Sequence, residues 1–217
     1  SLDEYEELAR EAYDRQDFAA AELWSRKVVN LQPENDEARY LWALALEGQG
    51  EAGRAYRQMR RLTPEGGAGF WPAHLWIAES LLDAQDRTPD QLRAAIDHLD
   101  AARRSAPATS SARVRRMLAD SRLALARTIT DSPDPSRDML LEAQAQLQAI
   151  LDAQRNHVDA RLLMAHVLQK QGADREAIPH LQHVADEHPE VWTRLAGIYL
   201  ELGERGNAKA ALEAARE

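Results

Sequence analysis

Two histidines and a glutamate near the end of the chain have the spacing of metal ligands. His180, His183 and Glu187 are three and four residues apart, so a helix places them along one face. Imidazole nitrogens and a carboxylate oxygen are common ligands of Zn²⁺. That face is expected to point outward, where polar side chains are usually solvated, and Pro179 loosens the first turns of the helix. We therefore expect a solvated surface here, with no bound metal.

No other set of residues has the spacing of an active site. The sequence contains no GxSxG, P-loop, HExxH or dinucleotide-binding glycine motif. It also contains no cysteine, which excludes thiol catalysis, disulfides and cysteine-ligated zinc. We therefore expect a protein that is not an enzyme and that needs no cofactor.

Composition narrows the class of partner. The 217 residues include 27 basic and 36 acidic side chains, a net charge of −9, which argues against a nucleic-acid binder. No stretch approaches the roughly 20 apolar residues of a membrane-spanning helix. The chain opens at Ser1 without a leader and ends at Glu217 inside an expected helix, so we expect a piece of a longer protein. The compartment, cytoplasm or periplasm, stays open.

Charge is unevenly distributed along the chain. Residues 1–37 hold 11 acidic and 4 basic side chains, a net charge of −7, whereas residues 103–127 hold seven arginines and one aspartate. Arginine clusters favour carboxylate or phosphate partners through bidentate hydrogen bonds. Two interpretations stay open: a solvated helix surface that pairs with neighbouring acids, or a site for an acidic partner segment, including the acidic end of another copy.

The elements that must position these residues are helices. Strand patterns are almost absent, and helical periodicity is interrupted by Pro, Gly and Asp clusters every 12 to 20 residues. Alanines recur in pairs, one in a first helix and one in a second helix. The paired alanines are 12, 12, 17, 24, 12 and 12 positions apart: Ala9 and Ala21, Ala43 and Ala55, Ala78 and Ala95, Ala119 and Ala143, Ala165 and Ala177, Ala196 and Ala208.

Glycine and proline follow the same register. Gly50, Gly172 and Gly203 come seven residues after a first alanine, where a helix must end. Twelve residues after a second alanine come Pro33, Pro107 and Pro189, which stop the second helix. A helix pair alone cannot bury such a face, so the pairs are expected to stack into one core.

This spacing resembles the tetratricopeptide repeat, whose pattern is W-x2-L-G-x2-Y followed by a central alanine and a closing proline. The sixth unit is closest, with Trp192, Leu195, Tyr199, Gly203 and Ala208. The resemblance covers the whole chain and implies an all-α fold, a right-handed α-α superhelix of about six helix pairs in a single domain. The expected repeats are approximately 2–33, 36–67, 71–107, 112–155, 158–189 and 190–217.

Three irregular stretches lie between the expected helices. Polar, proline-bearing insertions occupy residues 83–91 and 128–137, inside the third and fourth units, and are expected to form loops or short helix extensions. Residues 63–69 separate the second and third units, and their three glycines are consistent with a hinge or a long turn.

The resemblance also implies where a partner binds. In this family the first helix of each pair lines a concave groove, and the side chains at three register positions point into it. That stripe contains Glu6, Arg10, Tyr13, Tyr40, Leu44, Glu47, Leu75, Glu79, Leu82, Arg116, Asp120, Leu123, Leu162, His166, Gln169, Thr193, Gly197 and Leu200. The groove residues expected to contact a partner are Tyr13, Tyr40, Leu44, Leu75, Trp76, Leu82, Arg113, Arg116, Leu162 and His166.

The middle of this stripe is apolar and aromatic, which favours the apolar face of a peptide or helix. Phe70 and Trp71 either add to the groove or fold back and pack under the third unit. The clamp that some family members use for chaperone C-terminal peptides is not expected, because Asp3 and Glu6 stand where positive charge is required.

The leading hypothesis is therefore a non-enzymatic scaffold that binds a peptide or helix of another protein, with or without an acidic segment, in its groove. The alternative is an assembly or accessory module, through self-association of the solenoid ends or as a spacer in a larger complex. Bacterial members of the family serve in this way in envelope assembly and export, which is an analogy of fold alone.

Overall fold

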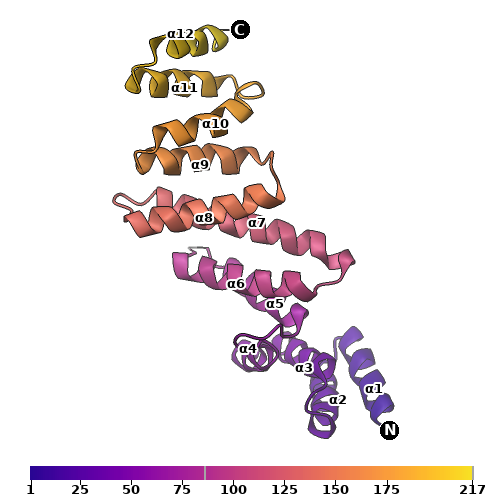
Figure 1. Ribbon diagram of the computed structural model, residues 1–217. Helices are drawn as coiled ribbons and strands as arrows, with labels where there is room; N and C mark the ends of the chain where they lie inside the picture. The colour runs from indigo at the N-terminus through magenta and orange to yellow at the C-terminus, as the bar shows by residue number, and fades with distance from the viewer. Residues whose placement is uncertain (86, 217) are drawn as a thin grey trace. The chain divides into compact units, whose positions relative to one another are not determined.

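A computed structural model describes residues 1–85 and 87–216 of the chain. Within these residues the structure contains twelve α-helices and no β-strand, so the predicted all-α class is confirmed. Asp86, in the first expected insertion, and Glu217, at the end of the sixth expected repeat, lie outside the described residues. The helices follow one another in pairs joined by short turns (Figure 1).

The chain forms two compact units, residues 1–118 and 119–217, and the boundary between them falls inside one helix, α7 (Ala108–Thr130). In unit 1, α1 contacts α2, α2 contacts α3, α3 contacts α4, and α5 contacts both α4 and α6. The helices of unit 1 before this boundary helix are α1 (Leu2–Asp14), α2 (Phe18–Leu31), α3 (Asp36–Gly48), α4 (Ala52–Arg61), α5 (Trp71–Leu82) and α6 (Pro89–Ser105).

Unit 2 is a series of consecutive helices in which each contacts the next from α8 to α12. Each register alanine expected at a close helix contact in these pairs is buried, as Ala143, Ala165 and Ala177 illustrate. The boundary helix α7 and the helices after it are α7 (Ala108–Thr130), α8 (Arg137–Ala153), α9 (Val158–Lys170), α10 (Asp174–Ala185), α11 (Glu190–Glu201) and α12 (Arg205–Ala214).

Local sequence explains where several helices begin. Ser1 and Thr88 form capping boxes with Glu4 and Gln91 at the starts of α1 and α6. Asn35 accepts a hydrogen bond from the Ala38 amide at the start of α3, at 2.9 Å. These caps satisfy amides that have no partner within the helix, so they fix the first residue of each helix.

The turn after a first helix requires a left-handed residue. Gly50, Gly172 and Gly203 have φ angles of 78°, 75° and 77°, as expected for glycine at that position. In the first helix pair the same register position is occupied by Gln16, with a φ of 60°. Gln16 is the one non-glycine residue with positive φ in the described part of the chain, and this conformation is strained for a residue that carries a Cβ.

The two insertions are partly helical. In the third unit, α5 ends at Leu82 and α6 begins at Pro89, so the loop is shorter than the inserted sequence. In the fourth unit, the insertion extends α7 to 23 residues, and residues 131–136 form the turn before α8. The repeat expected at residue 112 begins earlier, because α7 starts at Ala108.

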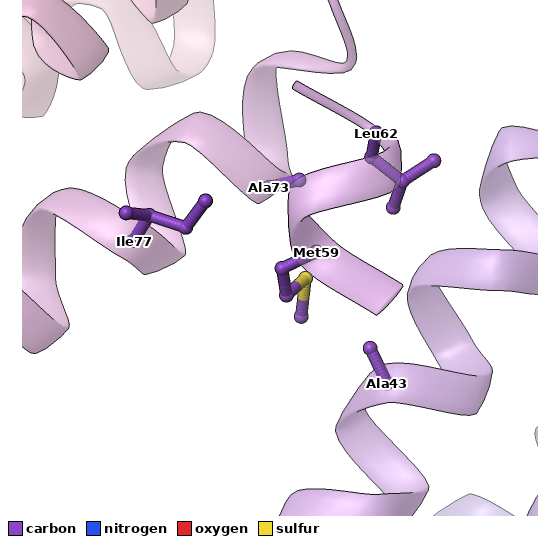
Figure 2. Packing of buried hydrophobic residues seen from close by; sticks show 5 residues of the cluster. All are labelled: Ala43, Met59, Leu62, Ala73 and Ile77. Atoms are coloured by element: carbon purple, nitrogen blue, oxygen red, sulfur yellow. The ribbon is translucent and has the colours of Figure 1, made fainter. Parts of the chain in front are cut away.

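The core of unit 1 is built from small and large side chains that meet across three helices. Met59 of α4 is fully buried and lies between α3, which carries Ala43, and α5, which carries Ala73 and Ile77 (Figure 2). The alanines let the helix backbones approach closely, and Met59 fills the space between them. The small register positions of the sequence are thus packing positions.

A pair of histidines lies inside unit 1. The Nδ1 atoms of His74 on α5 and His98 on α6 share a hydrogen bond of 2.8 Å, and His74 is only 5% exposed. Burial, followed by the charges of His98 and Arg104, lowers the pKa of His74 to about 4. Burial and the charge of Arg60 lower the pKa of His98 as well. The pair is therefore neutral at pH 7.

At the first helix pair an ammonium group lies over two aromatic rings. Tyr5 and Trp24 are stacked with their ring centroids 5.5 Å apart. The Lys27 Nζ lies 4.1 Å from the Tyr5 centroid and 5.4 Å from that of Trp24. This cation–π contact ties α1 to α2 at the surface.

Within the described residues, none of the helices has the combination of length and apolarity that a bilayer crossing requires.

Candidate functional site

A pocket of about 390 Å³ lies among the first three helices of unit 1. Four residues of the predicted stripe line it, namely two charged residues of α1 and two apolar or aromatic residues of α3. The complete lining is Glu6, Ala9, Arg10, Ser25, Val28, Asn35, Glu37, Ala38, Tyr40, Leu41 and Leu44. The wall is mostly apolar and the charges belong to Glu6, Arg10 and Glu37, which is the usual make-up of a small recognition site.

Asn35 links α1 and α3, two of the helices that line this pocket. Its Oδ1 caps α3, and its Nδ2 donates a hydrogen bond to the Glu6 carboxylate on α1 at 2.8 Å. Arg10 lies one helical turn after Glu6, with its guanidinium 3.8 Å from the same carboxylate. The pocket lining therefore includes an acidic group held by a hydrogen bond, and the Arg10 side chain beside it is 62% exposed.

Next to the pocket, aromatic and acidic residues of α1, α3 and α5 form a second feature, here called the acidic–aromatic cluster: Tyr13, Tyr40, Glu47, Trp76 and Glu79. The Trp76 Nε1 donates a hydrogen bond to the Glu47 carboxylate at 2.9 Å. The guanidinium of Arg113 forms an ion pair with Glu79. Tyr40 belongs to both the cluster and the pocket lining, so the two features are continuous.

Burial and the negative charge of this cluster raise the pKa values of its two tyrosines. Burial is the main cause that raises the pKa of Tyr40 to about 12, and the carboxylates of Glu79 and Glu47 add to it. Burial and the charge of Glu47 also raise the pKa of Tyr13. Both phenols therefore stay neutral hydrogen-bonding groups at any physiological pH.

One predicted groove residue is buried in the structure. Leu75 is only 8% exposed and belongs to the core, so it offers almost no surface to a partner. Trp76 and Leu82 are half-buried, and Trp76 packs against the core cluster of Figure 2. Phe70 packs against that cluster too, with its ring 5.5 Å from that of Tyr40, while Trp71 begins α5 and is half-buried.

The arginine-rich region is partly engaged within the chain. Arg103 forms an ion pair with Asp100, and Arg113 forms one with Glu79. Arg115 donates a hydrogen bond to the Ser111 hydroxyl at 3.0 Å. Arg116 is exposed, on the same helix. Binding of an acidic segment to this region stays a prediction.

In unit 2 the predicted groove residues lie on α9. Leu162 is half-buried and His166 is exposed. Partial burial, with the charges of Arg194 and Lys170, lowers the pKa of His166. A second pocket of about 500 Å³ lies at the ends of α8, α9 and α10, and it contains none of the stripe residues.

The three residues with metal-ligand spacing do not share one helix, because α10 ends at Ala185 and Glu187 lies after it. His183 contacts the Asn156 side chain through its Nε2 at 2.9 Å. His180 is half-buried, and burial with the charge of Arg161 lowers its pKa. Among the described residues no group of three or more His, Cys, Asp or Glu side chains could hold a metal ion.

Sequence reasoning missed one wall of the pocket. Ser25 and Val28 lie on α2, a second helix of a pair, and the stripe was drawn from first helices alone. The contribution of Asn35 was also missed, although an asparagine directly before the acidic start of a helix is a recognisable cap. The His74–His98 pair had no signal in the sequence, because the two residues belong to different helices.

Comparison with known proteins supports the repeat interpretation. A tetratricopeptide repeat family model matches residues 189–215, which contain α11 and α12. A search of curated proteins found no match. The sequence evidence therefore places one repeat at the last helix pair, and the other pairs rest on spacing and structure.

Solved structures of tetratricopeptide-repeat (TPR) proteins are similar over nearly the whole chain. The TPR domain of P58(IPK) has a TM-score of 0.50 and 19% identity, covering 99% of this chain and 59% of that one. This chain thus spans little more than half of that structure. PilF of Pseudomonas aeruginosa has a TM-score of 0.46 and 17% identity, covering 99% and 90%. YrrB, described as a TPR protein with an unusual peptide-binding site, has a TM-score of 0.47 and 16% identity, covering 88% and 90%.

Four helix pairs of equal spacing, left-handed residues at the turns of those four pairs and buried register alanines are all features of this repeat. Proteins of this class are generally non-enzymatic scaffolds for protein–protein interaction. This chain therefore has the tetratricopeptide-repeat fold, and its last helix pair is a tetratricopeptide repeat by sequence as well.

Proposed function

We propose that this chain is a non-enzymatic scaffold that binds a peptide or helix of another protein at the pocket formed by α1, α2 and α3. The observation that carries the proposal is that stripe residues chosen from the sequence, Tyr40 and Leu44 among them, line a pocket of about 390 Å³. A pocket of this size accepts one large apolar side chain of a partner, and burying that side chain contributes about 1.5–3 kcal/mol.

The pocket also supports orientation of the partner. Arg10, Glu6 and Glu37 belong to its lining and offer one cation and two carboxylates to partner backbone or side chains. An apolar anchor surrounded by a few placed polar groups is the arrangement that gives affinity and specificity at small interfaces.

The test is selection of short peptides from a random display library on the wild-type protein, followed by binding measurements on variants. Leu44→Glu places a charge in the pocket wall and is expected to weaken binding of a selected peptide more than about tenfold. Leu23→Glu is the matched control, because Leu23 is 50% exposed and does not line the pocket. Ala38→Leu, which fills the pocket without adding charge, gives a second variant.

Circular dichroism and urea unfolding confirm that each variant is folded. Equal binding to wild type, Leu44→Glu and Ala38→Leu would show that peptides bind elsewhere on the chain. The assembly-module alternative makes a different prediction, a mass that rises with concentration in light scattering while no peptide binds.

A further inference from the structure

The charge around the pocket is strongly one-sided. Two of its three charged lining residues, Glu6 and Glu37, are acidic, and the adjacent cluster adds Glu47 and Glu79. Residues 1–37, which supply α1, α2 and the start of α3, carry a net charge of −7. A partner segment that enters this pocket therefore meets a negative surface.

Two carboxylates of this surface, Glu37 and Glu47, form no ion pair with a described residue, and the one in the acidic–aromatic cluster is Glu47. It is exposed, its carboxylate accepts the Trp76 N–H at 2.9 Å, and no cation of the described residues lies within ion-pair distance of it. Neighbouring Glu79, in contrast, is already paired with Arg113. The Arg113 pair shows that a guanidinium is accommodated at this cluster, and Glu47 offers a second carboxylate that forms no ion pair with a described residue.

The surroundings of Glu47 suit a cation in another respect. Tyr13 and Tyr40 lie close enough to Glu47 for its charge to raise their pKa values, and Trp76 is in direct contact with it. Aromatic faces beside a carboxylate attract ammonium and guanidinium groups through cation–π contacts. A lysine or arginine side chain would find both kinds of contact here.

The pocket and this carboxylate are a short distance apart on one helix face. Tyr40, Leu44 and Glu47 follow one another at helical spacing along α3. At 1.5 Å per residue, Tyr40 and Glu47 are about 10 Å apart along the axis, which an extended peptide covers in about three residues.

We propose that the partner segment is cationic: it places an apolar side chain in the pocket and, within about three residues, a lysine or arginine on Glu47 beside Tyr13, Tyr40 and Trp76. This inference rests on the proposed function, because it names the chemistry of the segment bound at the same pocket. It differs from the acidic partner expected for the arginine-rich region, which lies later in the chain.

The experiment uses the peptides selected on the wild-type protein. It removes one charge from the peptide and one from the protein. In each peptide the basic residue nearest the apolar anchor is replaced by glutamine. In the protein, Glu47→Gln keeps an oxygen that accepts the Trp76 N–H and removes only the charge. Asp97→Asn removes one charge from an exposed position on α6 and is the control for net charge.

We expect the selected peptides to be enriched in lysine and arginine near one apolar residue. Fluorescence anisotropy is expected to show binding about fivefold weaker for Glu47→Gln, and less than about twofold weaker for Asp97→Asn. With the glutamine-substituted peptide, Glu47→Gln should make almost no further difference, because the partner charge is already gone. Raising the salt concentration should weaken binding of the cationic peptide more than binding of its glutamine-substituted form.

The outcomes separate the two proposals. If peptide binding is weakened by Leu44→Glu but is equally strong for peptides with basic, neutral or acidic residues beside the anchor, the proposal of a cationic partner is wrong and the pocket proposal is supported. Equal effects of Glu47→Gln and Asp97→Asn would also overturn it, by showing general attraction to an acidic protein. If no peptide binds, or if a second copy of the chain occupies the pocket, both proposals are wrong.

Discussion

The buried histidine pair makes the stability of unit 1 depend on pH. His74 has a pKa of about 4 in the folded protein and about 6.5 when unfolded, so between these values the unfolded chain binds the extra proton. Stability attributable to His74 is therefore complete above pH 6.5 and is lost as the pH falls toward 4. The difference between the two pKa values corresponds to a loss of about 2 kcal/mol between pH 7 and pH 4.5.

The perturbation is His74→Asn, which removes the titrating group and leaves an amide to pair with His98. The assay is urea unfolding followed by tryptophan fluorescence, because four of the five tryptophans lie in unit 1. Between pH 7 and pH 4.5 the free energy of unfolding of the wild type should fall by about 2 kcal/mol more than that of the variant. His183→Asn, at an exposed position of unit 2, is the control and should leave the wild-type difference unchanged.

His74 is buried and neutral, and the positive charges of Arg104 and Arg60, together with that of His98 once it is protonated, oppose protonation of His74. If the wild type and His74→Asn lose stability in parallel over this range, His74 is not the group that responds, and the acid sensitivity belongs to other residues. If His74→Asn has a lower free energy of unfolding than the wild type at pH 7 but loses the same amount between pH 7 and pH 4.5, the His74–His98 hydrogen bond stabilises the protein and the titration of His74 does not.

Two backbone predictions follow from the left-handed residues. Gln16→Gly should raise the free energy of unfolding by about 0.5–1 kcal/mol, because glycine has no Cβ to strain at a φ of 60°, and a lower or unchanged urea midpoint would contradict this. Gly69→Ala should lower the free energy of unfolding by more than about 2 kcal/mol, since a Cβ there would lie 2.6 Å from the His74 Nε2 at a φ of 58°. Gly66→Ala, at a φ of 72° with open space around it, is the control and should cost about 1 kcal/mol in the same assay.

Much of the fold follows from the sequence because small residues recur at fixed intervals. The alanine register locates the buried contacts, and Gly50, Gly172 and Gly203 mark turns that require left-handed backbone. The same register places Gln16 at such a turn, although its side chain gives no hint of the conformation. Spacing therefore predicts backbone geometry here better than residue type does.

The candidate site was only partly predictable. Tyr40 and Leu44 of the predicted stripe line a pocket, and their role in binding stays a prediction. Leu75, Trp76 and Ile77 are consecutive apolar residues, so periodicity does not tell which of them stays at the surface, and Leu75 is buried. Residues from second helices and the pairing of distant histidines depend on tertiary packing, which has no local pattern.

The contact of Lys27 with Tyr5 and Trp24 has a practical consequence for labelling the molecule. Lys27 is the only lysine among residues 1–118, and arginine does not react with amine-directed acylating reagents. Such a reagent would attach a single dye to a side chain of unit 1, at a residue that does not line the pocket. Acylation also removes the positive charge that lies over the Trp24 ring, so the emission of that indole would report its own modification.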